Sequence, residues 1–293
     1  MTVLGRGDVL VEGAGELCEG PCWDARTGTF VWVDILAGRV HVVDPVTGRR
    51  DEHRLGTPVG AVAARRSGGW VAAVERGFLL LDEDWMPVGE VLPAPGQPDG
   101  TRFNDGGCDP AGRFWAGTLA YDGRAGVAAL YVLRPDGVVT EALSGVTNSN
   151  GLAWSPDGCT LYYVDTGRGT VDRLDVDPAS GVVAGRRTLV AVPEAEGLPD
   201  GLTLDSEGYL WLALWGGCCV RRYSPAGELD RVVRLPVELV TSMAFGGVHL
   251  DELFITTACD GLTPEQRAKQ PMAGSIFRHR PGVIGLPAAA FAG

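Results

Sequence analysis

The stretch LPDGLTLDSEGYLWLALW, from Leu198 to Trp215, holds the pattern that decides the fold. A polar entry at Asp200 and Gly201 leads into a short apolar run. The turn DSEG follows, and GYLWLALW forms a second apolar run. Two such runs joined by a tight turn predict a pair of antiparallel strands. Nothing in this local pattern requires a charge at Asp200, so the reason for that carboxylate must lie elsewhere in the chain.

The same pattern recurs along the whole chain. Six segments of this kind begin at intervals of 40 to 50 residues, and the residues that open them are Glu19, Val59, Asn104, Asn150, Asp200 and Thr241. A second turn, such as DPVTG from Asp44 or DPASG from Asp177, follows the first in most repeats. Asp or Ser at the start and Gly at the end favour tight hairpins, because the side chain caps backbone amides and Gly accepts a positive φ. Two hairpins per repeat predict an all-β fold, a six-bladed β-propeller with four-stranded antiparallel blades, formed by residues 1–293 as a single domain.

Both ends of the repeat array need a partner. The early stretch DVLVEG, from Asp8 to Gly13, is a spare strand, and the last repeat has only ELFITT and SIFRHR as clear later strands. We expect the spare strand to pair with the last blade, which closes the ring and hides its edges. The segment LTPEQRAKQ, from Leu262 to Gln270, predicts a short helical turn with Thr263 as its cap and Pro264 in its first turn.

Composition excludes several classes of partner. The net charge of -12 repels nucleic acid and anionic membrane surfaces. No apolar run approaches the roughly 20 residues of a membrane span, and the start MTVLGRGDVLVEG lacks the pattern of a signal peptide, so a cytoplasmic location is expected. None of the four histidines has metal-ligand spacing with another, which argues against a histidine-held zinc and a Ser-His-Asp triad. The seven cysteines are interpreted as small buried apolar residues.

The repeat also explains the carboxylate at Asp200. The first strand of each propeller blade lines the central channel, so residues just before these strands form a ring at the channel mouth. Glu19, Asn104, Asn150 and Asp200 would meet there. Carboxylates brought together out of water destabilise one another unless a cation offsets their charge. Oxygen ligands alone suit Ca²⁺, Mg²⁺ or Mn²⁺ and do not exclude Zn²⁺. Taken singly, each of these residues could equally be an ordinary turn residue before a glycine.

The third repeat adds a cationic residue. Arg102 stands two residues before Asn104, and side chains two apart on an extended segment share a face. A guanidinium at the mouth would donate hydrogen bonds to a substrate. The alternatives are that Arg102 is a surface residue and that the neighbouring Asp105 caps the turn.

The chain resembles the SMP-30/gluconolactonase/regucalcin-like family over nearly its whole length. The resemblance is carried by EGPCWD, RFNDGGCDPAGRFWAGT, SNGLAWSPDG and LPDGLTLDSEGYLWLALW, in the family's order, and by the tail SIFRHRPGVIGLPAAAFAG. It implies a six-bladed propeller with a divalent metal in its central channel. It assigns Glu19, Asn150 and Asp200 to the metal, and Arg102 and Asn104 to substrate hydroxyls. Asp122, in LAYDG, is the counterpart of a further acidic substrate-binding position, where some relatives have the longer Glu.

The activity that the resemblance implies is hydrolysis of sugar lactones such as gluconolactone, with a small-molecule lactone as partner. We expect one divalent cation, Ca²⁺ first, with Zn²⁺, Mg²⁺ or Mn²⁺ as alternatives. Asp200 is expected to act both as a ligand and as the catalytic proton acceptor for the attacking water. Two other functions stay open: a metal-dependent organophosphate hydrolase on the same site, and a calcium-binding propeller without enzymatic activity.

Overall fold

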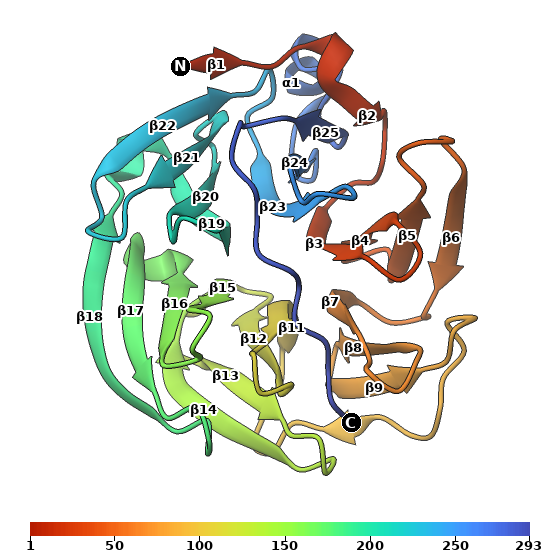
Figure 1. The fold of residues 1–293 in the computed structure, drawn as a ribbon, viewed down its shortest axis with the longest axis vertical. Coiled ribbons are helices and arrows are strands. Elements are labelled where there is room, and N and C mark those ends of the chain that lie inside the picture. The colour runs from red at the N-terminus through yellow and green to blue at the C-terminus, as the bar shows by residue number, and fades with distance from the viewer.

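Six sheets are arranged as blades around a central axis in the computed structural model, which describes residues 1–293 (Figure 1). Within each blade, strands that follow one another in the chain pair antiparallel, and the first of them is innermost. The prediction of a six-bladed propeller with four-stranded blades is confirmed.

The first three blades each take four consecutive strands. Blade 1 contains β3 (Cys18–Asp24), β4 (Thr29–Asp34), β5 (Arg39–Val43) and β6 (Arg50–Arg54). Blade 2 contains β7 (Val59–Ala64), β8 (Trp70–Val74), β9 (Gly77–Leu81) and β10 (Leu92–Pro93). Blade 3 contains β11 (Thr101–Cys108), β12 (Phe114–Ala120), β13 (Ala128–Leu133) and β14 (Val139–Val146).

The remaining blades complete the ring. Blade 4 contains β15 (Ser149–Trp154), β16 (Thr160–Asp165), β17 (Thr170–Val176) and β18 (Val183–Ala191). Blade 5 contains β19 (Leu198–Leu204), β20 (Leu210–Trp215), β21 (Cys219–Tyr223) and β22 (Leu229–Arg234). Blade 6 contains β23 (Val240–Gly246), β24 (Glu252–Thr257) and β25 (Ile276–His279).

The N-terminal segment closes the ring as expected. Strand β2 (Val9–Val11) pairs antiparallel with β25 and supplies the fourth strand of blade 6. Strand β1 (Thr2–Val3), which the repeat pattern does not predict, pairs in parallel with β22 and adds a fifth strand to blade 5. The first eleven residues therefore cover the outer edges of two blades, which leaves fewer backbone groups unpaired at those edges.

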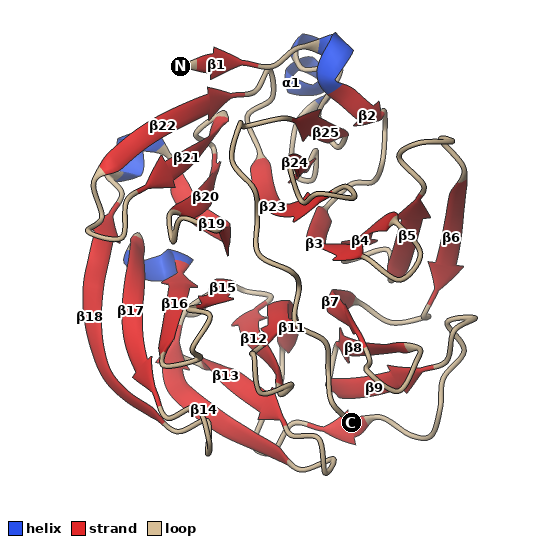
Figure 2. Ribbon diagram, in the orientation of Figure 1, coloured by secondary structure: helices blue, strands red, loops and turns tan.

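Helices are few (Figure 2). The single α-helix, α1 (Pro264–Lys269), has the predicted cap: the Thr263 hydroxyl accepts from Gln266 N at 3.3 Å, and the Gln266 side chain accepts from Thr263 N at 2.8 Å. Three short 3₁₀ turns complete the list, η1 (Arg6–Asp8), η2 (Thr166–Arg168) and η3 (Glu194–Glu196). No helix is of the length and apolar character that crossing a bilayer would need.

The acidic turn residues of the repeat have a structural role inside the blades. In blade 3, Asp109 accepts a hydrogen bond from the Trp115 indole at 2.8 Å. In blade 5, Asp205 accepts from the Trp211 indole at 2.9 Å and from Arg222 Nε at 2.8 Å. Each carboxylate thus joins the first turn of its blade to the second strand, and the buried indole donors are satisfied.

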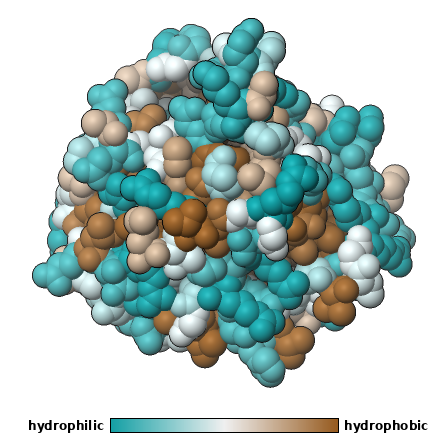
Figure 3. Space-filling view, turned by 90° about the horizontal axis from the view of Figure 1, so that it is seen from above, coloured by the Kyte–Doolittle hydropathy of each residue, from teal (hydrophilic) through white to brown (hydrophobic).

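Apolar packing is concentrated between neighbouring blades. The cluster between blades 3 and 4, for example, joins Trp115 and Leu130 to Leu161 and Tyr163, all of which are fully buried. Six clusters of this kind account for the core. From the edge of the disc, polar and apolar residues are interspersed on the surface (Figure 3). All seven cysteines are free. The expectation that they are buried is confirmed for Cys18, Cys219 and Cys259, whereas Cys22, Cys108 and Cys218 are half-buried and Cys159 lies exposed in a turn.

The C-terminal segment crosses the centre of the ring (Figure 1). It leaves blade 6, passes blade 5, where Ser206 N donates to Ile284 O at 2.9 Å, and reaches blade 2, where Phe291 N donates to Ala64 O at 2.9 Å. These contacts are made at or beside the turns that follow the innermost strands, so the segment lies at the end of the channel opposite to the residues that open the repeats. We call residues 282–293 the C-terminal strap.

Candidate functional site

The six residues that open the repeats all lie in the innermost strands, at or beside a break in strand register. The prediction placed them just before these strands, whereas the structure places each of them within its strand. Asn104, Asn150, Asp200 and Thr241 lie within the breaks, whereas Glu19 and Val59 are the last paired residues before them. A bulge re-aims the side chains next to it. Because the break recurs in every blade, each blade has one side chain at the channel mouth whose direction need not follow the regular alternation of a strand.

Glycines after the opening residues allow neighbouring blades to approach closely. A Cβ atom added to Gly151 would lie 2.4 Å from Leu202 N and 2.8 Å from Asp200 O. A Cβ atom at Gly60 would lie 2.8 Å from Asn104 O. Because contacts this short do not occur, these positions need glycine, and the innermost strands can converge only with glycine there.

A chain of hydrogen bonds then joins blades 3, 4 and 5. Arg102 Nη1 donates to Asn104 Oδ1 at 2.9 Å, and Asn104 Nδ2 donates to Asn150 Oδ1 at 2.9 Å. Asn150 Nδ2 donates to Thr166 Oγ1 at 2.7 Å, and that hydroxyl donates to Pro199 O at 2.8 Å. Every member of the chain fixes the orientation of the next, so the amide oxygen of Asn150 has a defined place at the mouth.

Arg102 is a buried residue and not a surface arginine. Only 6% of its surface is exposed, and its Nε atom has no hydrogen-bond partner in the protein. Burial lowers the pKa of its guanidinium. Its bond to Asn104 confirms that the two side chains share a face.

Three buried carboxylates belong to the same site. Glu19, Asp105 and Asp200 are 3%, 7% and 5% exposed, and they come from blades 1, 3 and 5. Burial raises the pKa of Glu19 well above its usual value, and the charges of Asp200 and Asp105 raise it further. Burial, followed by the charge of Asp105, likewise raises the pKa of Asp200. Burial raises the pKa of Asp105 from 3.8 to about 6. We call these three residues the carboxylate cluster.

Glu19 and Asp200 are the two carboxylates that the sequence predicts at the site, whereas Asp105 is predicted only as a possible turn cap. Regular strand alternation would send the side chains of Asn104 and Asp105 to opposite faces. The register of β11 breaks between Phe103 and Asp105, and Asp105 lies close enough to Asp200 for its charge to raise that residue's pKa. Its position directly after Asn104 in FNDGG was the only signal in the sequence.

The donor set fits a divalent cation. No group of three or more His, Cys, Asp and Glu side chains is arranged to hold a metal ion. A cation would therefore depend on an amide oxygen together with carboxylates, the combination expected from Glu19, Asn150 and Asp200. Buried carboxylates that destabilise one another need positive charge nearby. The charge of Arg102 lowers the pKa of Glu19, but by less than burial and the two neighbouring carboxylates raise it. Oxygen donors of this kind are suited to hard cations.

Asp122 is not brought to the carboxylate cluster. It lies in an exposed turn after β12 and forms an ion pair with Arg124, with Nε 2.7 Å from Asp122 Oδ2. A hydrogen bond from the Arg124 side chain, followed by one from its backbone amide, lowers the pKa of Asp122. Its assignment to substrate binding remains a prediction.

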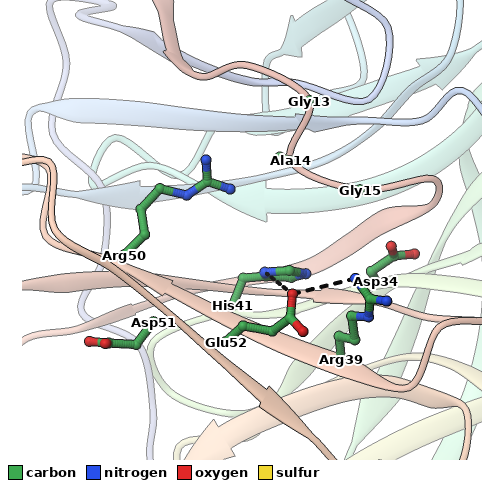
Figure 4. Close-up of a pocket in the computed structure, with 9 residues that line it drawn as sticks. All are labelled: Gly13, Ala14, Gly15, Asp34, Arg39, His41, Arg50, Asp51 and Glu52. Atoms are coloured by element: carbon green, nitrogen blue, oxygen red, sulfur yellow. Dashed lines mark hydrogen bonds and ion pairs between the residues drawn. The ribbon is translucent and has the colours of Figure 1, made fainter.

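A polar hollow of about 230 Å³ lies on blade 1 and contains none of the predicted site residues (Figure 4). Its charged lining residues are Asp34, Arg39, His41, Arg50, Asp51 and Glu52. Glu52 lies 3.4 Å from Arg39 Nη1 and 4.0 Å from His41 Nδ1, and Asp34 accepts from the amides of Glu16 and Leu17. The His41 ring stacks on Trp32 with their centroids 5.0 Å apart. Most of these groups are thus engaged in holding blade 1 together.

Fold and site together define a class: a six-bladed β-propeller with buried carboxylate and amide side chains at one mouth of its channel. Residues 17–259 match the family SMP-30/Gluconolactonase/LRE-like region, and the chain belongs to this family.

Individual relatives cover nearly the whole chain. Regucalcin of Xenopus laevis is 38% identical over 293 residues, which is 98% of each chain. YvrE of Bacillus subtilis, named as a candidate sugar lactone lactonase, is 35% identical over 276 residues and 94% of each chain. The crystal structure of a calcium-binding protein, regucalcin from Agrobacterium tumefaciens, superimposes with a TM-score of 0.92 at 29% identity and covers 99% of each chain.

Proposed function

We propose that this protein is a metal-dependent hydrolase that opens sugar lactones, gluconolactone or a related aldonolactone, to the aldonic acid. The observation that carries the proposal is the buried carboxylate cluster beside the Asn104–Asn150 amide pair, whose three carboxylates form no ion pair with a cationic side chain. The name of the Bacillus subtilis relative supports lactone hydrolysis as the reaction class. The names of the regucalcin relatives and the calcium-binding neighbour support a divalent cation.

In this proposal Glu19, Asn150 and Asp200 hold the cation. A divalent cation supplies a Lewis acid for the lactone carbonyl oxygen, on which negative charge develops when water adds. The structure has no histidine in this set, so the proton acceptor must be a carboxylate. Asp200 takes a proton from the attacking water, the ring C–O bond breaks, and the proton passes to the departing ring oxygen. A carboxylate that holds a cation is a weak base, so polarisation of the water by the cation would supply part of the driving force for this proton transfer.

In this proposal, residues of blade 3 orient the substrate. Arg102 and Asn104 are held to each other by a 2.9 Å hydrogen bond, so their donors have fixed positions relative to the cation ligands. Fixed donors lower the entropic cost of placing the lactone carbon next to water. Arg102 Nε is buried and lacks a protein acceptor, so one donor of the guanidinium has no partner within the protein.

An organophosphate hydrolase on the same site is the second candidate, and it would need an apolar wall. Phe103, which directly precedes Asn104 in the sequence, is buried in the core between blades 2 and 3. Tyr121 is exposed, and its hydroxyl is bonded to Glu75. The polar surroundings of Arg102 favour a polyol over an aryl phosphate ester.

The test is a pH-drop assay over a panel of aldonolactones. The protein is first stripped with EDTA and then resupplied with Ca²⁺, Zn²⁺, Mg²⁺ or Mn²⁺ singly, and a paraoxon-type ester is assayed in parallel. We expect hydrolysis of at least one aldonolactone, loss of activity in EDTA and recovery with at least one cation. Cation binding by calorimetry without any hydrolysis would support the non-enzymatic calcium-binding alternative. Turnover of the ester alone would support the organophosphate hydrolase.

A further inference from the structure

A set of contacts leads outward from Arg102 to residues that directly follow strands of blades 2 and 3, which we call the rim of the site. The Arg102 guanidinium lies over the ring of Tyr121, 5.9 Å from its centroid. Tyr121 directly follows β12 and is 51% exposed. Its hydroxyl donates a hydrogen bond of 2.7 Å to Glu75 Oε1. Glu75 directly follows β8, so blades 2 and 3 are joined next to the residue expected to bind substrate.

The backbone of Glu75 is held in place. Gln97, which is buried, donates from Nε2 to Glu75 O at 2.9 Å. Arg76 donates from Nη2 to Gln97 O at 2.9 Å and from Nη1 to Pro98 O at 2.8 Å. The segment that leads from blade 2 to blade 3 therefore anchors this corner of the rim. An acceptor anchored in this way loses little conformational entropy when a ligand binds.

Glu75 retains capacity to accept a ligand hydrogen bond. No cationic side chain forms an ion pair with it, and the Tyr121 hydroxyl engages Oε1 only, which leaves Oε2. Its charge nevertheless acts on Arg102, where it raises the pKa of the guanidinium against the effect of burial. Asp122, the acidic residue that the family resemblance indicates, is engaged at both carboxylate oxygens by Arg124.

We infer that Glu75, oriented by Tyr121, is a substrate-binding residue that accepts a hydrogen bond from a ring hydroxyl of the lactone bound beside Arg102. This inference rests on the proposed lactonase function and names its substrate class: polyhydroxylated lactones and not unsubstituted ones. A carboxylate is a strong acceptor for a hydroxyl. A site built to bond a hydroxyl also discriminates against the analogue that lacks it, because its polar groups are then left without partners.

The test compares two six-membered lactones that differ only in hydroxyl groups and hydroxymethyl, D-glucono-1,5-lactone and δ-valerolactone. The specificity ratio is kcat/KM for the first divided by kcat/KM for the second. The variants are Glu75→Gln, which keeps an acceptor for Tyr121 but loses the charge, and Tyr121→Phe, which removes the hydroxyl that orients Glu75. Glu90→Gln, at an exposed position of the same blade, is the matched control.

Hydrogen bonds to charged groups contribute about 1.5–3 kcal/mol, so we expect Glu75→Gln to lower the specificity ratio by about tenfold or more. The loss should appear in KM for gluconolactone, with the valerolactone rate unchanged. Tyr121→Phe should lower the ratio in the same way but by less, and Glu90→Gln should not change it.

The inference is overturned if the wild-type protein opens gluconolactone and neither Glu75→Gln nor Tyr121→Phe changes the ratio. It is also overturned if Asp122→Asn lowers the ratio and Glu75→Gln does not. Failure of the wild-type protein to open any lactone is a different result, because it refutes the proposed function itself.

Discussion

Replacement of Asp105 by Asn is expected to stabilise the metal-free protein at neutral and alkaline pH. Asp105 is almost fully buried, and burial raises its pKa from 3.8 to about 6. Its carboxyl therefore binds a proton more tightly in the folded protein than in the unfolded chain. The stability that this provides is fully present below pH 3.8, the unfolded value, and is lost as the pH rises through about 6.

The magnitude follows from the size of the shift. Each pKa unit corresponds to about 1.4 kcal/mol, so deprotonation of Asp105 in the folded state lowers the free energy of unfolding by about 3 kcal/mol between pH 4 and pH 8. Asn keeps the oxygen that accepts from Gly106 N at 2.7 Å and cannot ionise. The raised pKa values of Glu19 and Asp200 act in the same direction, so a bound cation should reverse the loss in the wild-type protein.

The assay is urea unfolding in EDTA for wild type and Asp105→Asn between pH 5 and pH 8. The stability difference in favour of the variant should grow as the pH rises. Asp44→Asn is the control, and this variant should be less stable than wild type. A hydrogen bond from the Thr47 hydroxyl and two from backbone amides lower the pKa of Asp44, so its ionised carboxylate stabilises the fold. A difference between wild type and Asp105→Asn that stays constant over this pH range would refute the reasoning.

Three further predictions concern the site and its support. Asp200→Asn should lower kcat for lactone hydrolysis by at least about 10²–10³ and reduce the content of bound cation, and near-normal values of both would exclude the role proposed for Asp200. Gly151→Ala should lower cation affinity in calorimetry, because its Cβ atom would lie 2.4 Å from Leu202 N and force blades 4 and 5 apart; unchanged affinity would count against the close approach. Phe291→Ala should lower the free energy of unfolding in urea by about 3–5 kcal/mol, because the Phe291 ring is buried between blades 2 and 3. Val248→Ala, at an exposed position, should change it by less than about 0.5 kcal/mol, and equal effects of these two variants would show that the C-terminal strap is not packed as described.

Much of the fold was predictable because a propeller repeats its local pattern. Turn residues and alternating apolar runs depend on neighbours in the chain, and each blade shows them separately. The spare strand β2 and the capped helix α1 were predicted on the same grounds, and the structure confirms both. The C-terminal strap was not predicted, because its backbone bonds reach Ala64 and Ser206, far from it in sequence.

The amino-acid sequence by itself determined the number of blades and the positions that open them, since equivalent residues recur at regular intervals. That periodicity was enough to bring Asn104 and Asn150 together, and the structure shows them joined by a hydrogen bond. The tertiary structure alone decided that Asp105 joins Glu19 and Asp200, because a break in strand register overrides the alternation of side chains. It also decided that Glu75 lies beside Tyr121 and Arg102. Those contacts depend on how two blades are rotated about the axis and on the segment that anchors their rim, which no local pattern encodes.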